Sequence, residues 1–320
     1  MTRRHNSCLA PRLVGLGVLL SALAITVRPA NSQVVTPTQA RQINNDLANN
    51  AVAAVEVFSA GKLVATGSFD YDNTATPDVK FHTYKLPLSH MLGARSNSVR
   101  PFLEGYLGYF DLNQPLSTLN PSWGSLEVLS GTATLGGGVE VDLEDWATLV
   151  PRLQFAYSHV EMTLEGLPPS PLDQILASWR ADALTVLPSL ELRAHRTWGR
   201  WDVLFSSHYS YLRVMGIDDS SDLIELDSET HLWRNEISTR FHSPWRTFGL
   251  PLDFGALFAR HDVEGQIRQS DFVSHFYEAR GTVFWKLPSR FEPVSEISLS
   301  GAYYFQGPLT GYSVGLSLAF

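Results

Sequence analysis

Cysteine is nearly absent from this sequence of 320 residues, which contains only Cys8. We expect Cys8 to be removed with an N-terminal export signal, so the mature chain would have neither a disulfide nor thiolate chemistry. The ten histidines are scattered without the spacing of a zinc site. No glycine-rich loop is followed by Lys and Ser or Thr, as a phosphate-binding loop would be. These absences predict a protein without a metal, a cofactor or cysteine-based catalysis.

Basic residues are also scarce, because 24 Lys and Arg stand against 32 Asp and Glu, a formal net charge of −8. The first 32 residues contain four arginines and no acidic residue. Removal of that segment leaves a mature chain with a formal charge of about −12. Phosphate binding needs clustered Lys and Arg, so the charge argues against a nucleic-acid partner.

Long hydrophobic runs are missing after residue 32, although 44% of the residues are hydrophobic. No later segment has the roughly 20 consecutive apolar residues of a transmembrane helix. Large aromatic residues instead alternate with small or polar ones, which is typical of a strand that turns only one face to lipid. The composition therefore predicts a membrane β-barrel.

Residues 1–32 have the pattern of a secretory signal peptide. Two arginines precede an uncharged, mostly apolar run over residues 13–27, and the small residues Ala30 and Ser32 predict cleavage before Gln33. The alternative, a transmembrane anchor, needs more than these roughly 15 residues. We expect the Sec route of export, because a barrel must cross the inner membrane unfolded.

The C-terminal end shows the clearest alternation. Every second residue from Tyr312 to Phe320 is apolar or aromatic, whereas the residues between them, from Gly311 to Ala319, are small or polar. Gln306-Gly307-Pro308 divides the uncharged stretch after residue 296 into two alternating runs. This pattern favours two strands over one helix.

The same period of two recurs upstream, with a weaker candidate at Val52–Phe58. Bacterial single-chain barrels have even strand numbers, so we predict twelve strands, with ten or fourteen as alternatives. The predicted strands are Leu63–Tyr71, Val79–Pro87, Ser98–Leu112, Gly131–Leu143, Val150–Leu164, Asp182–Thr197, Arg200–Val214, Thr230–His242, Leu250–Val263, His275–Leu287, Val294–Phe305 and Leu309–Phe320.

The connections between these strands differ in length in a regular way. If Phe320 ends in the periplasm, the outward loops include Asn113–Ser130, Glu165–Ala181 and Met215–Glu229, whereas the tight Trp198–Gly199 turn faces inward. Long loops outside and short turns inside are the asymmetry of outer-membrane barrels.

Residues 36–53 have helical character ahead of the strands. Thr36 is a suitable N-cap with Pro37 at the first helical position. Apolar residues recur at helical spacing (Ala40, Ile43, Leu47, Ala51), and the opposite face is polar (Gln42, Asn44, Asp46, Asn49). Such a helix would suit a wet barrel lumen, and a periplasmic tail is the alternative.

The last strand also matches the outer-membrane assembly signal, through Ser313, Gly315, Leu318 and Phe320. In that signal a polar residue, a glycine and two hydrophobic or aromatic residues hold fixed places, and the insertion machinery can read the strand through β-augmentation. The Arg100–Tyr109 segment resembles the proline-aromatic-glycine strand of autotransporter barrels. Nearly all of the mature chain thus resembles autotransporter translocator domains, and most of all the solitary barrels without a passenger. The resemblance implies a structural, translocator-like or narrow-pore role.

Charged residues of both signs recur on the strand faces opposite the apolar ones. They could line a polar pore and set its ion preference, or pair with one another and rigidify the wall, and we favour pairing. The candidate lumen-lining residues are Arg100, Glu104, Glu140, Arg152, Glu191, Arg193, Arg234, Glu236, Arg240, Asp253, Glu278, Arg280 and Glu296.

His208 and Ser210 have the pattern of a catalytic pair. Residues i and i+2 of a strand share a face, so the imidazole could activate the hydroxyl, as in some outer-membrane lipid hydrolases. The Asn-Gly that usually follows in those enzymes is replaced by Tyr211-Leu212, and the alternation puts the pair on the lumen face rather than the lipid face. We therefore expect no enzyme and keep a lipid esterase as an alternative.

The sequence thus predicts an all-β protein, a transmembrane antiparallel barrel in the outer membrane of a Gram-negative cell. Residues 1–32 would be removed, 33–53 would form a helical segment and 54–320 the barrel. The expected partners are outer-membrane lipid and lipopolysaccharide, the barrel assembly machinery at the C-terminal strand, and periplasmic chaperones in transit. We expect a monomer, and an open porin-like solute channel is the main alternative function.

Overall fold

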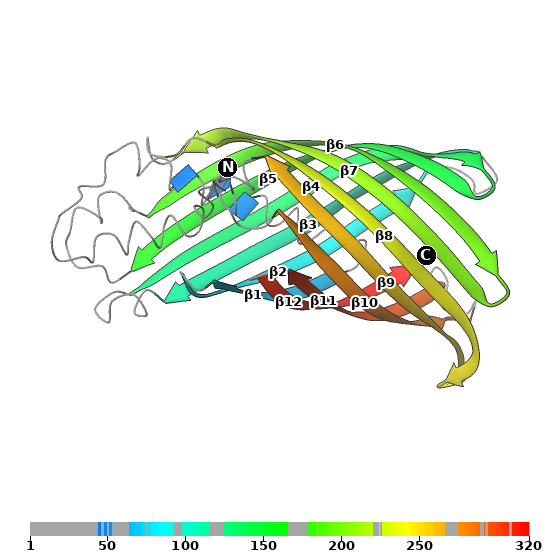
Figure 1. Ribbon diagram of the computed structural model, residues 1–320. Helices are drawn as coiled ribbons and strands as arrows, with labels where there is room; N and C mark the ends of the chain where they lie inside the picture. The colour runs from blue at the N-terminus through cyan, green and yellow to red at the C-terminus, as the bar shows by residue number, and fades with distance from the viewer. Residues whose placement is uncertain are drawn as a thin grey trace, which may run out of the picture.

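Twelve antiparallel strands form one closed barrel in the computed structural model (Figure 1). The model describes residues 44–45, 48–49, 51–52, 64–73, 76–92, 98–115, 124–165, 178–219, 224, 226–265, 274–288, 291, 294–306 and 309–319. Each strand pairs with its neighbours in sequence, and β12 pairs with β1 to close the barrel. The predicted fold class is therefore confirmed.

The strands run nearly the whole length of the described chain. They are β1 (Val64–Asn73), β2 (Thr76–Met91), β3 (Val99–Pro115), β4 (Ser125–Glu144), β5 (Ala147–Glu165), β6 (Trp179–Trp198), β7 (Trp201–Asp219), β8 (Asp227–Thr247), β9 (Leu250–Gly265), β10 (His275–Lys286), β11 (Glu296–Gln306) and β12 (Leu309–Ala319).

Most strands extend beyond their predicted ranges. β4 begins six residues before the predicted Gly131, and β8 continues past the predicted His242. The alternation of apolar and polar residues marks only the part of a strand that meets lipid, whereas hydrogen-bonded pairing continues beyond it. The predicted outward loops Asn113–Ser130, Glu165–Ala181 and Met215–Glu229 were wrong at their edges for the same reason, because strand residues occupy them.

The two ends of the barrel differ. Tight turns at Asp145–Trp146, Gly199–Arg200 and Phe248–Gly249 join strands at one end, which we call the turn end. The β3–β4, β5–β6, β7–β8 and β9–β10 connections leave from the opposite loop end, on the left in Figure 1. By the asymmetry of outer-membrane barrels, the turn end faces the periplasm.

The outer surface carries the apolar residues of the alternation. In β12, Tyr312, Val314, Leu316 and Leu318 are about half exposed, whereas Gly311 and Gly315 face inward and are buried. Apolar residues exposed in this alternating way form the band that contacts lipid. Among the described residues, no helix is long and apolar enough to cross a membrane.

Several predictions concern residues outside the described part. These are the signal peptide over residues 1–32, the helix start at Thr36 and Pro37, and the terminal Phe320. The weak strand candidate Val52–Phe58 is wrong at its first residue, because Val52 is helical, and residues 53–58 lie outside the described part.

Candidate functional site

The inward faces of the strands change character along the barrel axis. In β3, Arg100 and Glu104 lie toward the turn end, and Tyr106, Phe110 and Leu112 follow toward the loop end. In β11 the same direction runs from Glu296 through serines to Ala302 and Tyr304. The lumen therefore has a charged half at the turn end and an apolar half at the loop end.

Buried aromatic rings build the apolar half. Phe69 stacks on Phe81 with 5.0 Å between ring centroids and lies 5.1 Å from Tyr304. Phe81 in turn contacts Phe110 at 5.5 Å, and Tyr304 contacts Phe276 at 6.2 Å. This row of rings crosses the seam between β1 and β12 and belongs to a cluster drawn from strands on all sides of the barrel.

The described helical residues lie inside this apolar half. Ala48, Ala51 and Val52 are at most 2% exposed and belong to the same cluster as the aromatic rings, and the blue helical segments lie within the loop-end half of the barrel (Figure 1). The described helical residues therefore lie within the lumen and not in a periplasmic tail. The prediction that Asn44 and Asn49 form a wet face is wrong, since both are buried. This helix is therefore covered on more than its apolar side.

Ion pairs fill the charged half on the β3–β7 side. The Arg193 guanidinium is 2.7 Å from carboxylate oxygens of both Glu140 and Glu191. Arg152 pairs with Glu191 and lies 3.2 Å from Glu104. The charges alternate along one continuous series, which runs through Asp142, Arg100, Glu140, Arg193, Glu191, Arg152 and Glu104.

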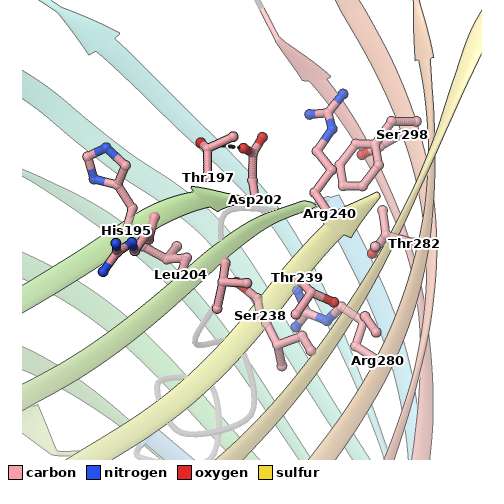
Figure 2. A pocket seen from close by; sticks show the side chains of 16 residues that line it. His195, Thr197, Asp202, Leu204, Ser238, Thr239, Arg240, Arg280, Thr282 and Ser298 are labelled. Carbon is pink, nitrogen blue, oxygen red and sulfur yellow. Dashed lines mark hydrogen bonds between the residues drawn. The ribbon is translucent and has the colours of Figure 1, made fainter. Parts of the chain in front are cut away.

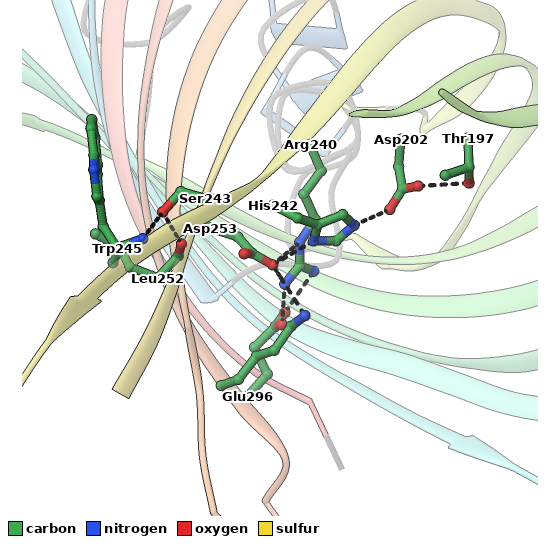
Figure 3. Close-up of polar contacts among 10 residues, drawn as sticks. Thr197, Asp202, Arg240, His242, Ser243, Trp245, Leu252, Asp253 and Glu296 are labelled. Carbon is green, nitrogen blue, oxygen red and sulfur yellow. Dashed lines mark hydrogen bonds and ion pairs between the residues drawn. The ribbon is translucent and has the colours of Figure 1, made fainter. Parts of the chain in front are cut away.

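A second set of ion pairs occupies the β7–β11 side (Figure 3). Asp253 is nearly buried and accepts from Arg240 at 2.8 Å, while Arg240 also pairs with Glu296. His242 lies between two carboxylates, with Nδ1 2.9 Å from Asp253 and Nε2 2.6 Å from Asp202. Closer to the apolar half, the buried Glu278 contacts three partners, Arg234, His261 and Arg280.

All of the candidate lumen-lining residues form ion pairs in the structure. His242, His261 and Lys286 join them, although sequence reasoning did not single out these three. Their positions on alternating strand faces were readable, but their partners depend on the pairing register of the strands. Because opposite charges neutralise one another at contact distance, the wall presents paired charges and not a field of one sign.

A cavity of about 520 Å³ lies in the charged half, between β6 and β11 (Figure 2). Its lining includes the hydroxyl groups of Thr197, Ser238, Thr282 and Ser298 together with Arg240 and Arg280. Leu204, Leu257 and Phe284 also line it. Both guanidinium groups are already paired with carboxylates, so the cavity offers an anion no unpaired cation from these two residues.

His208 and Ser210 lie together on the inner wall, with 3.2 Å between Nε2 and Oγ. Among the described residues, no carboxylate forms a hydrogen bond with His208, and the neighbouring Glu191 is bonded to Arg152, Arg193 and Ser206. A catalytic histidine needs a group that orients it toward the nucleophile. This geometry alone does not support a hydrolase. The described part of the chain also contains no group of three His, Cys, Asp or Glu arranged to hold a metal.

The assembly-signal residues lie in β12 as far as the structure describes them. Ser313 Oγ is 3.4 Å from the Tyr304 hydroxyl, and the Ser300 hydroxyl donates to the carbonyl oxygen of Gly315. Leu318 points outward. The inward residues thus bond to β11, while the outward ones remain on the lipid face.

A closed barrel with a lipid-facing apolar band, tight turns at one end and a helix in its lumen defines an outer-membrane β-barrel of the autotransporter type. A family model described as the solitary outer membrane autotransporter β-barrel domain matches residues 58–316, and this chain belongs to that family.

Solved autotransporter domains share the fold at low sequence identity. The translocator domain of NalP from Neisseria meningitidis is 9% identical, with a TM-score of 0.56, over 88% of this chain and 99% of that one. The transport unit of AIDA-I from Escherichia coli is 10% identical, with a TM-score of 0.54, over 87% and 98%. The β domain of the Bordetella autotransporter BrkA is 14% identical, with a TM-score of 0.50, over 80% and 98%. No curated protein matches the sequence.

Proposed function

We propose that this protein is a translocator-like outer-membrane barrel that keeps its own N-terminal helix in the lumen and is therefore sealed. The observation that carries the proposal is the near-complete burial of Ala48, Ala51 and Val52 among inward residues of the barrel. A helix held in this way occupies the space that a solute would need.

Apolar burial stabilises the helix inside the lumen. Two of its described contact residues are alanines, which allow the helix to lie close to the aromatic rings of the wall. Withdrawal of the helix would expose Phe69, Phe81 and their neighbours to lumen water, and each large apolar side chain loses roughly 1.5–3 kcal/mol on such exposure. The sealed state is therefore the stable one.

The charged half supports a structural role over a selective pore. A pore that chooses ions by sign needs a ring of one charge, whereas Arg100, Arg193 and their neighbours are neutralised by carboxylates. An open porin-like channel remains the rival function, and it requires conduction by the complete mature chain.

The route to the membrane belongs to the same proposal. The signal peptide would direct Sec export with cleavage before Gln33, and periplasmic chaperones would hold the unfolded chain. The assembly machinery would then read β12, with Leu318 and Phe320 presented to it, and insert a monomeric barrel into lipid. Shortening the chain by Phe320 should lower the amount of assembled barrel in cells, as measured by heat-modifiable mobility of the outer-membrane fraction.

Conductance in planar bilayers tests the sealing. The mature chain should be silent, and a chain that lacks residues 33–53 should conduct. Ala48→Asp places a charge in the apolar half and should open the lumen part of the time. Asn45→Asp adds the same charge at a less buried helix position and serves as the matched control. Heat-modifiable mobility would verify that each variant is folded.

Two outcomes would contradict the proposal. Equal conduction by the mature and shortened chains would make the protein an open pore with a helical tail. Silence of both chains would mean that the wall's own side chains fill the lumen and the helix is not the seal.

A further inference from the structure

Three arginines at the turn end differ from the other arginines of the barrel. Arg196, Arg200 and Arg246 are exposed and form no ion pair with any described residue. The arginines that do form ion pairs with carboxylates are Arg100, Arg152, Arg193, Arg213, Arg234, Arg240, Arg260 and Arg280. In a chain with more acids than bases, free guanidinium groups gathered at one place need an explanation.

These arginines are close in sequence to an arc of outward-facing aromatic rings, in which the tryptophans are exposed. Trp198 and Trp201 face one another across the β6–β7 turn, and Trp201 contacts Phe241 with 4.8 Å between ring centroids. Phe241 is opposite Phe254 in the ladder, and Phe254 contacts Trp245 at 5.7 Å. The three tryptophans are 57%, 48% and 63% exposed in chain order. Tryptophan rings of this kind lie at the level of lipid headgroups.

The arc fixes the height and the direction of Arg196. Arg196 and Trp198 are two residues apart on the outward face of β6, and the Arg196 guanidinium lies 5.5 Å from the Trp198 ring centroid. Arg200 is in the turn between Trp198 and Trp201, and Arg246 follows Trp245. The Arg196 guanidinium is therefore held where phosphate groups of the membrane surface would be, and Arg200 and Arg246 lie at the same end of the barrel.

The loop end provides a contrast on the same outer surface. There, Arg213 pairs with Asp227 and Glu229, and Arg260 pairs with Asp262 at 2.6 Å. Cations at the loop end thus have carboxylate partners within the protein. At the turn end, no carboxylate of the described residues pairs with Arg196, Arg200 or Arg246, and the periplasmic leaflet of the outer membrane is a source of anions there.

We propose that Arg196, Arg200 and Arg246 bind the phosphate groups of anionic phospholipids in the periplasmic leaflet, next to the aromatic arc. Guanidinium groups bind phosphate through two parallel hydrogen bonds, and the flanking rings would bury the upper part of the acyl chains. Anionic lipids fit better than zwitterionic ones, because their phosphate charge has no cation of its own to neutralise it.

Native mass spectrometry of the refolded mature protein tests the site with dioleoyl phosphatidylglycerol and dioleoyl phosphatidylcholine as probes. The wild-type barrel should retain phosphatidylglycerol in preference, and added salt should weaken the preference. The triple variant Arg196→Gln, Arg200→Gln, Arg246→Gln should lose retention by about fivefold for each arginine removed. Arg260→Gln, at a paired and outward position of the loop end, should leave it unchanged.

A charge-keeping variant distinguishes binding from structure. Arg196→Lys should retain more phosphatidylglycerol than Arg196→Gln, and heat-modifiable mobility should be the same for both. Equal retention of the two lipids by wild type, or unchanged retention in the triple variant, would overturn the proposal.

Discussion

Toward the loop end, aromatic rings pack around a helix in the barrel interior, and Phe69 and Phe81 are fully buried. Toward the turn end, the same strands point Arg193, Glu191 and Asp253 at partners of opposite charge, next to a cavity of about 520 Å³. One half is therefore held by apolar contact and excludes water. The other is held by pairing and tolerates water.

The difference between the two halves explains why the helix lies in the apolar half of the lumen. An apolar half gains free energy from any close-fitting apolar surface, whereas a charged half must satisfy each charge with a partner in the right place. Ala48 and Val52 lie in the apolar half, where close packing of apolar side chains stabilises the helix. The charged half keeps the wall rigid without needing the helix.

The largest effect on the free energy of unfolding is expected when a carboxylate is introduced into the apolar half. Phe69→Asp buries an unpaired carboxylate among rings and should lower the free energy of unfolding by about 4 kcal/mol or more. Ser298→Asp places the same group beside Arg240 and Arg280 in the charged half and should lower it by about 1 kcal/mol. Urea titration of the refolded barrel, followed by mobility on gels, measures both. Equal losses would break the distinction between the halves.

A smaller effect is expected when one member of the charged series is removed. Arg152→Met leaves Glu104 without its ion-pair partner and should cost about 3 kcal/mol. The double variant Arg152→Met, Glu104→Leu should recover most of that loss, because Glu191 keeps its pair with Arg193. The same urea titration would give the coupling between the two sites. A double variant as unstable as the sum of the single ones would show that the two charges do not stabilise one another.

The smallest effect is expected at the seam of the apolar half. A Cβ on Gly311 would lie 2.3 Å from Cδ1 of Phe69, so Gly311→Ala should cost about 1–3 kcal/mol. Gly301, on the outward face of β11, has open space around the same position, and Gly301→Ala should change stability by about 0.5 kcal/mol or less. If Gly311→Ala were equally neutral, the ring of Phe69 would have room to move, and the apolar half would be packed more loosely than described.

The outer surface was readable from the sequence because lipid imposes a simple rule on it. Every second residue of β12 had to be apolar, and Tyr312, Val314 and Leu316 revealed both the strand and its orientation. Toward the loop end the outward face becomes more polar while the inward face turns apolar, as at Glu127 beside the buried Leu126 and Val128, so the contrast that marks a lipid-facing strand is lost. The ends of β4 and β8 were for that reason predicted too short.

The interior was only partly readable. The charged residues were identifiable by their strand face, but Arg193 and Glu140 are 53 positions apart, and only the register of three strands brings them together. The sequence analysis did not predict the apolar half, because there the outward and the inward faces of the strands both carry apolar or aromatic residues. Tyr303 points outward and Tyr304 inward, so consecutive aromatic residues conceal which of them faces the lumen.

The seam between β1 and β12 also determines how the barrel can be completed. Its ladder runs only from Val64 opposite Leu316 to Tyr71 opposite Leu309. All other strand pairs join neighbours in sequence, whereas this pair joins the first strand to the last. Contacts so distant in sequence are slow to form because of loop-closure entropy. Until they form, the protein is an open sheet with two bare edges, each able to pair with a foreign strand. We therefore expect pairing of β12 with β1 to be a late step of folding, the one that removes both edges and closes the barrel.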